Sequence, residues 1–371
     1  MEYVDCCYFC VSTFQLIPIL SIALSQKDKG DLYIEPVFKD AVFFAQKLEK
    51  TGIFHHIIII PHDEIYSKHF KSTHPGLFNH WEIVKSYLHV EQVAKMILRP
   101  DVTYRHMYLS TRAYFPRIVQ LSLIKRKVNT KIILFEDGVG SYLNFMIAKP
   151  KKFDSVVRKI LFGKKSMNRD GDGYLFCPEI FESINPCHNY RIKKMERIWE
   201  REEGKRIFDS LFPMAKDSVF PEQAIIIDAI KSEIFSIENA RKLDNLYKLI
   251  IEKIGIDHVV IKKHPRDEEP EDQRLQYYLH PETPFECVCM NMDMSEKIVI
   301  SYSSTAATTP KILLDQEPYV IMLYKLVEGN AKLSQELSSY FESVKGLYRQ
   351  EDRFFIPENM EELKEILEFI C

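Results

Sequence analysis

Short apolar runs alternate with segments of helical periodicity along most of the chain, and this alternation constrains the fold more than any other feature. The runs include "DLYIEPVF", "YRHMYLS" and "KIILF", which are too continuously apolar for strands with one face in water. Strands that alternate with helices form parallel sheets covered on both faces. The pattern therefore predicts an α/β fold.

The alternation stops at about residue 148 and resumes at "QAIIIDAI", after a stretch of basic and charged segments. A chain of 371 residues is too long for one ordinary core and suits two domains of roughly 150 residues. We expect Rossmann-like domains over 1–147 and 222–350, a helical, basic connector over 148–221, and a C-terminal helix over 351–371. "FECVCM" is expected to be a strand, "DGDGYLF" a turn, and "YRIKKMERIWEREEGKRIFDSLF" one charged helix.

The charges nearly balance, with 50 Lys and Arg against 53 Asp and Glu, so no basic field argues for binding nucleic acid. Three of the eight cysteines, Cys6, Cys7 and Cys10, lie in an apolar strand-like run with no matching Cys/His pair nearby. This pattern favours buried free thiols in a reducing compartment over a zinc site. We therefore expect a cytoplasmic protein.

Two segments bear on membrane contact. The apolar N-terminal stretch lacks a basic leading region and is interrupted by Asp5 and Pro18, which favours a strand and helix over a membrane span. The basic, amphipathic stretch Lys149–Lys165 is either a solvated face or a surface for anionic lipid headgroups. Peripheral contact with the inner face of the membrane stays an open alternative.

The first of three polar clusters follows the predicted strand "KIILF", where Glu136 and Asp137 precede Gly138 and Gly140. Glycine permits the positive φ of a tight turn, and a carboxylate at the carboxyl end of a strand can act as a general base. Adjacent residues of an extended chain point to opposite sides, so one acid is expected to face a ligand. The alternative is a solvated turn whose acids cap the next helix.

The second cluster is "VVIKKHPRD", in which Lys262 and His264 follow a buried strand and Pro265 stiffens the turn before Arg266. Cations beside a histidine suit a phosphate, and the histidine could protonate a leaving oxygen. An exposed basic turn is the alternative.

The third cluster, Ser303, Ser304 and Thr305, begins a helix directly after a strand. Hydroxyl and backbone N–H groups there can bind an anion, although capping by one serine explains part of the pattern. The chain has neither GxxxxGK[ST] nor GxGxxG, so nucleoside triphosphate hydrolysis and NAD binding lack their usual motifs.

In this order, the three clusters resemble the bacterial sialyltransferases of glycosyltransferase family 52, the lipooligosaccharide and capsule type. Members of that family carry "[DE]DGxG" in the first domain and "HPR" in the second, matched here by "EDGVG" and "KHPRD". "TPFE" at Thr283–Glu286 and the opening "VSTFQL" also fit. The resemblance covers most of the chain.

The resemblance implies a GT-B fold, with two Rossmann-like domains facing each other across a cleft. The first would bind the acceptor and the second the nucleotide sugar. Asp137 would be the general base, and His264 would contact and protonate the departing phosphate. Implied donor-binding residues are Lys262, Pro265, Arg266, Glu286, Ser303, Ser304 and Thr305.

The motifs leave the base open. Glu136 is less favoured than its neighbour Asp137. Some relatives place an important acid after the first strand of the second domain, which makes Asp228 or Glu233 an alternative.

The implied reaction is inverting, metal-independent and cofactor-free transfer of sialic acid from CMP-sialic acid to a terminal galactose of a lipooligosaccharide or capsule glycan. A second hypothesis keeps the fold and changes the donor, for example to a nucleotide-linked hexose. A third makes the protein a non-catalytic nucleotide-sugar-binding subunit of a capsule assembly complex. A homodimer is neither required nor excluded.

Overall fold

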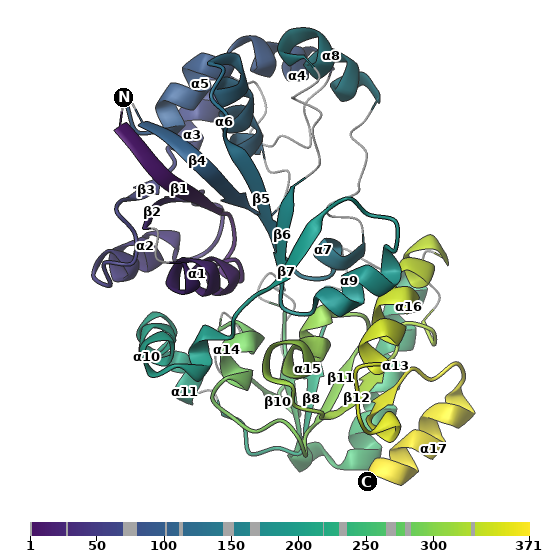
Figure 1. Cartoon of the computed structure of the whole chain (residues 1–371). Coiled ribbons are helices and arrows are strands. Elements are labelled where there is room, and N and C mark those ends of the chain that lie inside the picture. Colours follow the sequence, from purple (N-terminus) through teal and green to yellow (C-terminus); the bar gives the residue numbers. More distant parts are fainter. Residues whose placement is uncertain are drawn as a thin grey trace. The chain divides into compact units, whose positions relative to one another are not determined.

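The computed structural model describes residues 2–26, 29–69, 80–100, 102–110, 114–143, 152–163, 171–217, 219–229, 236–264, 272–278, 283–327 and 331–371 (Figure 1). The chain divides into two compact units, Met1–Ile207 and Phe208–Cys371. Each unit is built on a parallel sheet, as the alternation of strands and helices predicts.

In the described part of the first unit, seven strands form a parallel sheet in the order β3-β2-β1-β4-β5-β6-β7. Their bounds are β1 Glu2–Cys10, β2 Gly30–Ile34, β3 Ile57–Ile59, β4 Val102–Leu109, β5 Lys131–Phe135, β6 Asp172–Leu175 and β7 Arg191–Lys194.

Helices cover both faces of this sheet. The bounds are α1 Leu16–Ser25, α2 Ala41–Glu49, α3 His62–His69, α4 His80–Leu88, α5 Val90–Ile97, α6 Tyr114–Lys125, α7 Val139–Leu143, α8 Lys152–Phe162, α9 Pro178–Ile184, η3 Ile198–Glu200 and α10 Glu202–Leu211, which ends beyond the unit boundary.

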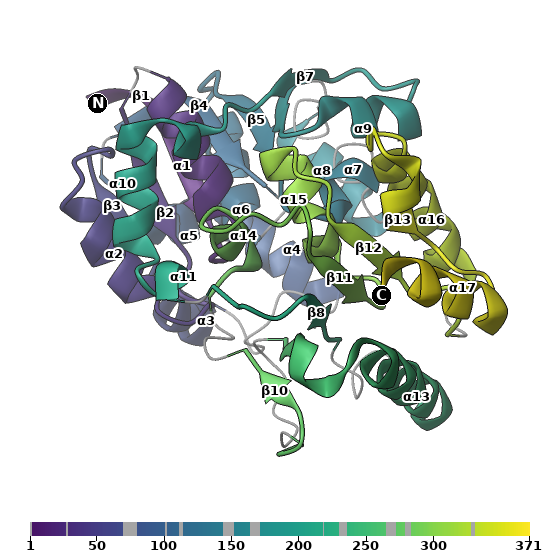
Figure 2. The ribbon, with the colours of Figure 1, turned by 90° about the horizontal axis from the view of Figure 1, so that it is seen from below.

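Alternate residues of β1 show why both faces are apolar. Cys7 and Phe9 pack into the core formed with α3, α5 and α6, while Tyr8 points the other way and stacks on Tyr108 at 4.8 Å between ring centroids. The helices α5 and α6 lie side by side in both views (Figures 1 and 2). Cys6, Cys7 and Cys10 are buried and form no disulfide, in agreement with the prediction from the apolar run.

The described part of the second unit contains a six-stranded parallel sheet in the order β10-β9-β8-β11-β12-β13. Its strands are β8 Ala224–Ile227, β9 Val259–Lys262, β10 Gln276–Tyr277, β11 Ile298–Ser301, β12 Tyr319–Met322 and β13 Phe354–Phe355. Its helices are α11 Met214–Asp217, α13 Ile237–Ile254, η4 Ile256–His258, α14 Phe285–Cys289, η5 Thr305–Thr308, α15 Thr309–Leu314, α16 Ala331–Lys345, η6 Glu351–Arg353 and α17 Met360–Ile370.

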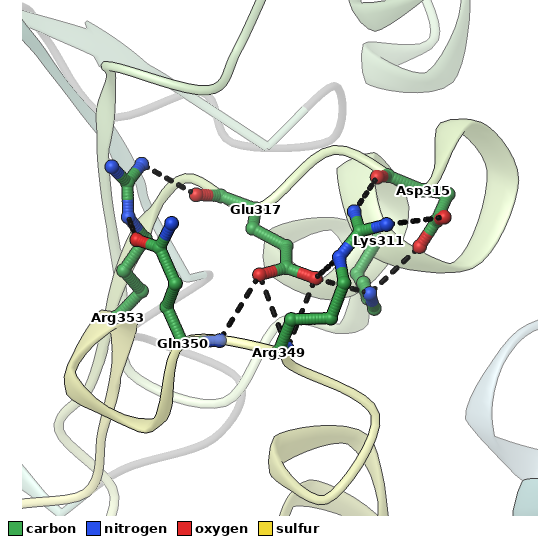
Figure 3. A network of polar contacts seen from close by, with 6 residues as sticks. All are labelled: Lys311, Asp315, Glu317, Arg349, Gln350 and Arg353. Atoms are coloured by element: carbon green, nitrogen blue, oxygen red, sulfur yellow. Dashed lines mark hydrogen bonds and ion pairs between the residues drawn. The ribbon is translucent and has the colours of Figure 1, made fainter.

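An ionic network around the buried side chains of Glu317 and Lys311 connects the loop before β12 to the segment after α16 (Figure 3). The Glu317 carboxylate accepts from Lys311 Nζ at 2.6 Å, from Arg349 Nε at 2.9 Å and from the backbone N–H of Gln350 at 3.3 Å. Burial raises the pKa of Glu317, but these hydrogen bonds outweigh it and lower the pKa to about 2. The network therefore holds two loops of the second unit together.

The expected helical connector over 148–221 is wrong in its central part. Residues 172–175 and 191–194 form β6 and β7 of the first sheet, so "DGDGYLF" is not a turn after Gly171, and the expected single charged helix is divided among β7, η3 and α10. Asp170 lies outside the described residues. The carboxylate of Asp172 is paired with Lys131 and Arg191, which shows why an acid is tolerated in this strand.

Two further elements differ from the prediction. "FECVCM" was expected to be a strand, but Phe285–Cys289 form α14, because Phe285, Cys287, Val288 and Cys289 can all be buried in one short helix. The segment 351–371 contains η6 and the edge strand β13 before its helix α17. No described helix combines the length and the apolar character that crossing a bilayer requires.

Candidate active site

The turn after β5 places two acids at the carboxyl edge of the first sheet. Gly138 has a φ of 72°, in the region that favours glycine, so the predicted need for a glycine in this turn is confirmed there. Gly140 lies within α7 and does not have a positive φ, so the same expectation is wrong at that position. The backbone N–H of Asp137 donates to Ser141 Oγ at 2.6 Å, which fixes the start of α7.

Glu136 points into the unit. Its side chain is buried, and its Oε2 accepts from the Tyr142 hydroxyl at 2.7 Å and from the backbone N–H of Phe176 at 2.8 Å. The carboxylate thereby connects β5 to α7 and to the residue that follows β6. These contacts give Glu136 a structural role and turn it away from its neighbour.

Asp137 lies on the other side of the turn and stays partly exposed. Its carboxylate accepts hydrogen bonds from the side chains of Gln15 and Ser110. Gln15 follows β1 and Ser110 follows β4, and β1, β4 and β5 are consecutive in the sheet. The carboxyl ends of three strands thus bring these groups together, as expected for sites in parallel sheets.

The orientation of the Gln15 amide follows from its backbone contact. The N–H of Val11 donates to Gln15 Oε1 at 2.8 Å, so the Nε2 group faces Ser110 Oγ at 2.6 Å and the carboxylate of Asp137. Burial raises the pKa of Asp137, and the hydrogen bonds from Gln15 and Ser110 partly offset that effect. A partly buried carboxylate with a raised pKa and fixed orientation suits a general base.

Gln15 and Ser110 were not among the residues singled out by sequence reasoning. "VSTFQL" contains Gln15 and was noticed as a motif, but nothing in it indicates a contact with residue 137. Ser110 has no sequence signal beyond its place directly after a strand. Sheet order, and not chain order, makes the two residues neighbours.

In the second unit, β9 ends at Lys262, whose buried ammonium lies 4.9 Å from the centroid of the Tyr278 ring. Lys263 and His264 follow and are partly exposed. Pro265 and Arg266, the remaining members of the predicted phosphate-binding turn, lie outside the described residues, as does Glu233.

The run of hydroxyls after β11 forms a short 3-10 turn before α15. Ser304 caps this turn, since its Oγ accepts from the backbone N–H of Ala306 at 3.3 Å, while Ser303 and Thr305 are partly exposed. Ser301 Oγ donates to the carbonyl of Ile227 at 3.0 Å and so ties β11 to β8.

Glu286 in α14 accepts a long hydrogen bond from the Thr309 hydroxyl at 3.5 Å. Burial raises the pKa of Glu286, and the nearby charge of Lys262 and the Thr309 hydroxyl act against that effect. The second unit thus brings Lys262, Glu286 and Thr309 together. Asp228, the other alternative base, accepts from the backbone N–H of Ala229 at 2.8 Å, and its charge contributes to the raised pKa of the buried Tyr247.

The described residues contain no group of three or more His, Cys, Asp or Glu side chains placed to hold a metal ion.

A model of the alpha-2,8-polysialyltransferase family matches residues 62–320. The chain belongs to this family. The matched range contains Asp137 and its turn, Lys262 and His264, and the hydroxyl run after β11. Membership in the polysialyltransferase family confirms the general prediction of a sialyltransferase type of enzyme, although the family found differs from the family 52 of the sequence resemblance.

Solved structures similar to this chain have the GT-B fold, which confirms the predicted fold class. The UDP-GlcNAc 2-epimerase from Methanocaldococcus jannaschii has a TM-score of 0.52 and 13% identity, covering 98% of this chain and 92% of its own. The glycotransferase of kitacinnamycin has a TM-score of 0.53 and 8% identity, covering 99% and 90%. At such identities the likeness concerns the fold alone. A search of curated proteins found no match.

Proposed function

We propose that this polysialyltransferase family member transfers sialic acid from CMP-sialic acid to a glycan hydroxyl, with Asp137 as the general base. The observation that carries the proposal is the different placement of the two adjacent acids. Glu136 is buried by Tyr142 and Phe176, whereas Asp137 is held at the sheet edge by Gln15 and Ser110. Of the two acids, only Asp137 is partly exposed.

The chemistry requires few protein groups. Asp137 takes the proton of the acceptor hydroxyl as that oxygen attacks the anomeric carbon, and the bond to the CMP phosphate breaks through an oxocarbenium-like state. In-line attack inverts the anomeric configuration. His264 would protonate or contact the departing phosphate, beside the positive charge of Lys262, and the reaction as proposed uses no metal.

The remaining donor contacts are proposed from the predicted motifs. Ser303, Ser304 and Thr305 would donate to the CMP phosphate, and Glu286 would accept from the ribose hydroxyls. The partial exposure of Ser303 and Thr305 is consistent with this role.

The acceptor proposed from the sequence was a terminal galactose of a surface glycan. The description of the family instead specifies α-2,8 linkage and a polymer of sialic acid, which favours an acceptor that itself ends in sialic acid. We adopt the sialic acid acceptor and keep galactose as the alternative. Both belong in the same assay.

The test is CMP release from CMP-sialic acid, measured with sialic-acid-terminated and galactose-terminated oligosaccharides. Asp137→Asn should lower kcat by about a hundredfold or more because the amide cannot accept a proton. CMP should still raise the melting temperature of the variant, since a ligand that binds the folded state stabilises it. Glu49→Gln, an exposed acid at the end of α2, is the control and should match the unchanged protein.

Normal turnover by Asp137→Asn would overturn the assignment of the base. CMP binding without turnover in the unchanged protein would favour the non-catalytic subunit. Turnover only with a nucleotide-linked hexose would favour the hexosyltransferase.

A further inference from the structure

The ammonium group of Lys262, at the end of β9, lies against an aromatic ring. Its Nζ is 4.9 Å from the centroid of the Tyr278 ring, and both side chains are buried. Tyr278 follows β10, and its backbone N–H donates to the carbonyl of Ile261 at 2.9 Å, which continues the hydrogen bonding between β10 and β9. The ring is therefore fixed to the strand that carries the lysine. Tyr278 was not singled out from the sequence.

This contact lies at the carboxyl edge of the second sheet. The strand β9 is paired with β8 on one side and with β10 on the other, and the N–H of Asp228, which follows β8, donates to the Lys262 carbonyl at 3.0 Å. His264 follows Lys262 by two residues. Ligands of parallel α/β sheets bind beyond this edge, so the charge of Lys262 lies beside the proposed phosphate site.

A ring and a carboxylate hold a buried cation in different ways. Both offset the cost of removing an ammonium group from water, but a carboxylate also cancels the positive charge. An aromatic face attracts the cation through its quadrupole and leaves the charge in place. Because an uncancelled charge acts over a longer distance in the low dielectric of a protein interior, a lysine held by a ring can attract a phosphate that it does not touch.

The acid beside Lys262 fits this arrangement. Glu286 belongs to α14, and burial raises the pKa of its carboxyl group, while the charge of Lys262 lowers that pKa. Burial thus disfavours the ionised form of Glu286. The acid therefore cancels less of the positive charge than an exposed carboxylate would.

We propose that Tyr278 is a positioning residue of the donor site: its ring holds Lys262 as a buried cation at the end of β9, so that the charge stabilises the phosphate group of bound CMP. The inference rests on the proposed function, which places that phosphate near Lys262 and His264. It adds a residue that no motif contains. The role requires the ring of Tyr278 and not its hydroxyl group.

The test compares the binding of CMP with that of cytidine, which lacks the phosphate, by calorimetric titration. Tyr278→Leu should raise the Kd for CMP roughly tenfold, as expected for the loss of a cation–π contact with a desolvated lysine, and should leave the Kd for cytidine unchanged. Tyr278→Met is a second variant without a ring and carries the same expectation. Tyr278→Phe keeps the ring and should bind both ligands as the unchanged protein does.

A double variant tests whether the ring acts through the lysine. Lys262→Met should also weaken the binding of CMP and not of cytidine. In that background, Tyr278→Leu should change the Kd for CMP no further, because the ring has no cation left to hold.

Phe220→Leu is the matched control, because the Phe220 ring lies 5.1 Å from Lys297 Nζ in the same kind of contact. Phe220 precedes β8 and Lys297 precedes β11, so this contact lies at the amino edge of the sheet, away from the proposed phosphate site. The variant should leave the ratio of the Kd values for CMP and cytidine unchanged.

The outcomes separate this inference from the proposed function. Equal weakening of CMP and cytidine binding by the variants without a ring, or the same loss in Tyr278→Phe, would overturn the role of the ring. The expected pattern in a protein that transfers no sialic acid would support the inference and contradict the proposed function. A protein that binds no CMP would contradict both.

Discussion

At the scale of the residue, the Glu136–Asp137 pair shows what local sequence can predict. The alternation of an extended chain predicts that the two side chains diverge, and the structure agrees. The direction of each depends on Tyr142, Phe176, Gln15 and Ser110, and three of these lie 27 to 122 positions away from the acid that each contacts. Such contacts cannot be derived from local spacing.

The two acids should differ in their effects on stability. Glu136→Ala leaves the Phe176 N–H and the Tyr142 hydroxyl without their acceptor and should lower the free energy of unfolding by about 2 kcal/mol. Asp137→Asn removes a carboxylate whose ionised form burial disfavours, so it should not lower that free energy. Urea unfolding measures both. Equal destabilisation by the two variants would contradict the structural assignment of Glu136.

At the scale of the element, prediction succeeded for strongly apolar strands and failed for polar ones. The run "KIILF" was predicted to be a strand and is β5, Lys131–Phe135, whereas β7, "RIKK", is an edge strand with mostly exposed side chains and lacks an apolar signal. The strand β6 was missed for a different reason: it lies inside the sheet, but Asp172 and Gly173 are residue types typical of turns. Only the neighbouring strands reveal these two elements.

The loop network around Glu317 gives the second unit an acid-sensitive element. The folded-state pKa of Glu317, about 2, lies below its usual value of about 4.3. The contribution of this group to stability is therefore present above about pH 4.3 and is lost as the pH falls toward 2. Glu317→Ala should lower the free energy of unfolding by about 3 kcal/mol at pH 7, because Lys311 loses its buried partner. The loss should shrink in unfolding measured at pH 3, and an equal loss at both pH values would contradict it.

The membrane contact expected of the Lys149–Lys165 stretch can be tested on α8, which is the described part of that stretch. Asp154 and Arg158 pair on its buried side, while Val156 and Ile160 are 56% and 76% exposed. Lys149, Lys151, Lys164 and Lys165 lie outside the described residues. If this face contacts lipid, Ile160→Glu should reduce cosedimentation with phosphatidylglycerol vesicles about tenfold. The variant replaces an apolar side chain that would enter the lipid with a negative charge, which the anionic headgroups repel.

Ile237→Glu is the matched control, because Ile237 is also 76% exposed but begins a helix of the second unit. It should bind these vesicles as the unchanged protein does, and phosphatidylcholine vesicles should bind none of the three. Undiminished binding by Ile160→Glu would remove α8 from the contact.

At the scale of the whole molecule, both units follow one rule: polar residues that matter are placed where parallel strands end. Three strand ends recognisable in the sequence carry Asp137, then Lys262 with His264, and the hydroxyl run. Gln15 and Ser110 become neighbours of Asp137 only through the strand order β1-β4-β5. Strand identity was accessible from local pattern, but strand order was not.

The hydrogen bond from the Val11 N–H to the side-chain oxygen of Gln15 has a practical consequence. Because that amide donates to Asp137, the pKa of the Asp137 carboxyl depends on the segment between β1 and α1. A fusion tag or truncation that frays β1 would withdraw the donor and raise the proton affinity of Asp137. Its activity profile would then drift toward alkaline pH while the bulk of the enzyme still looked native.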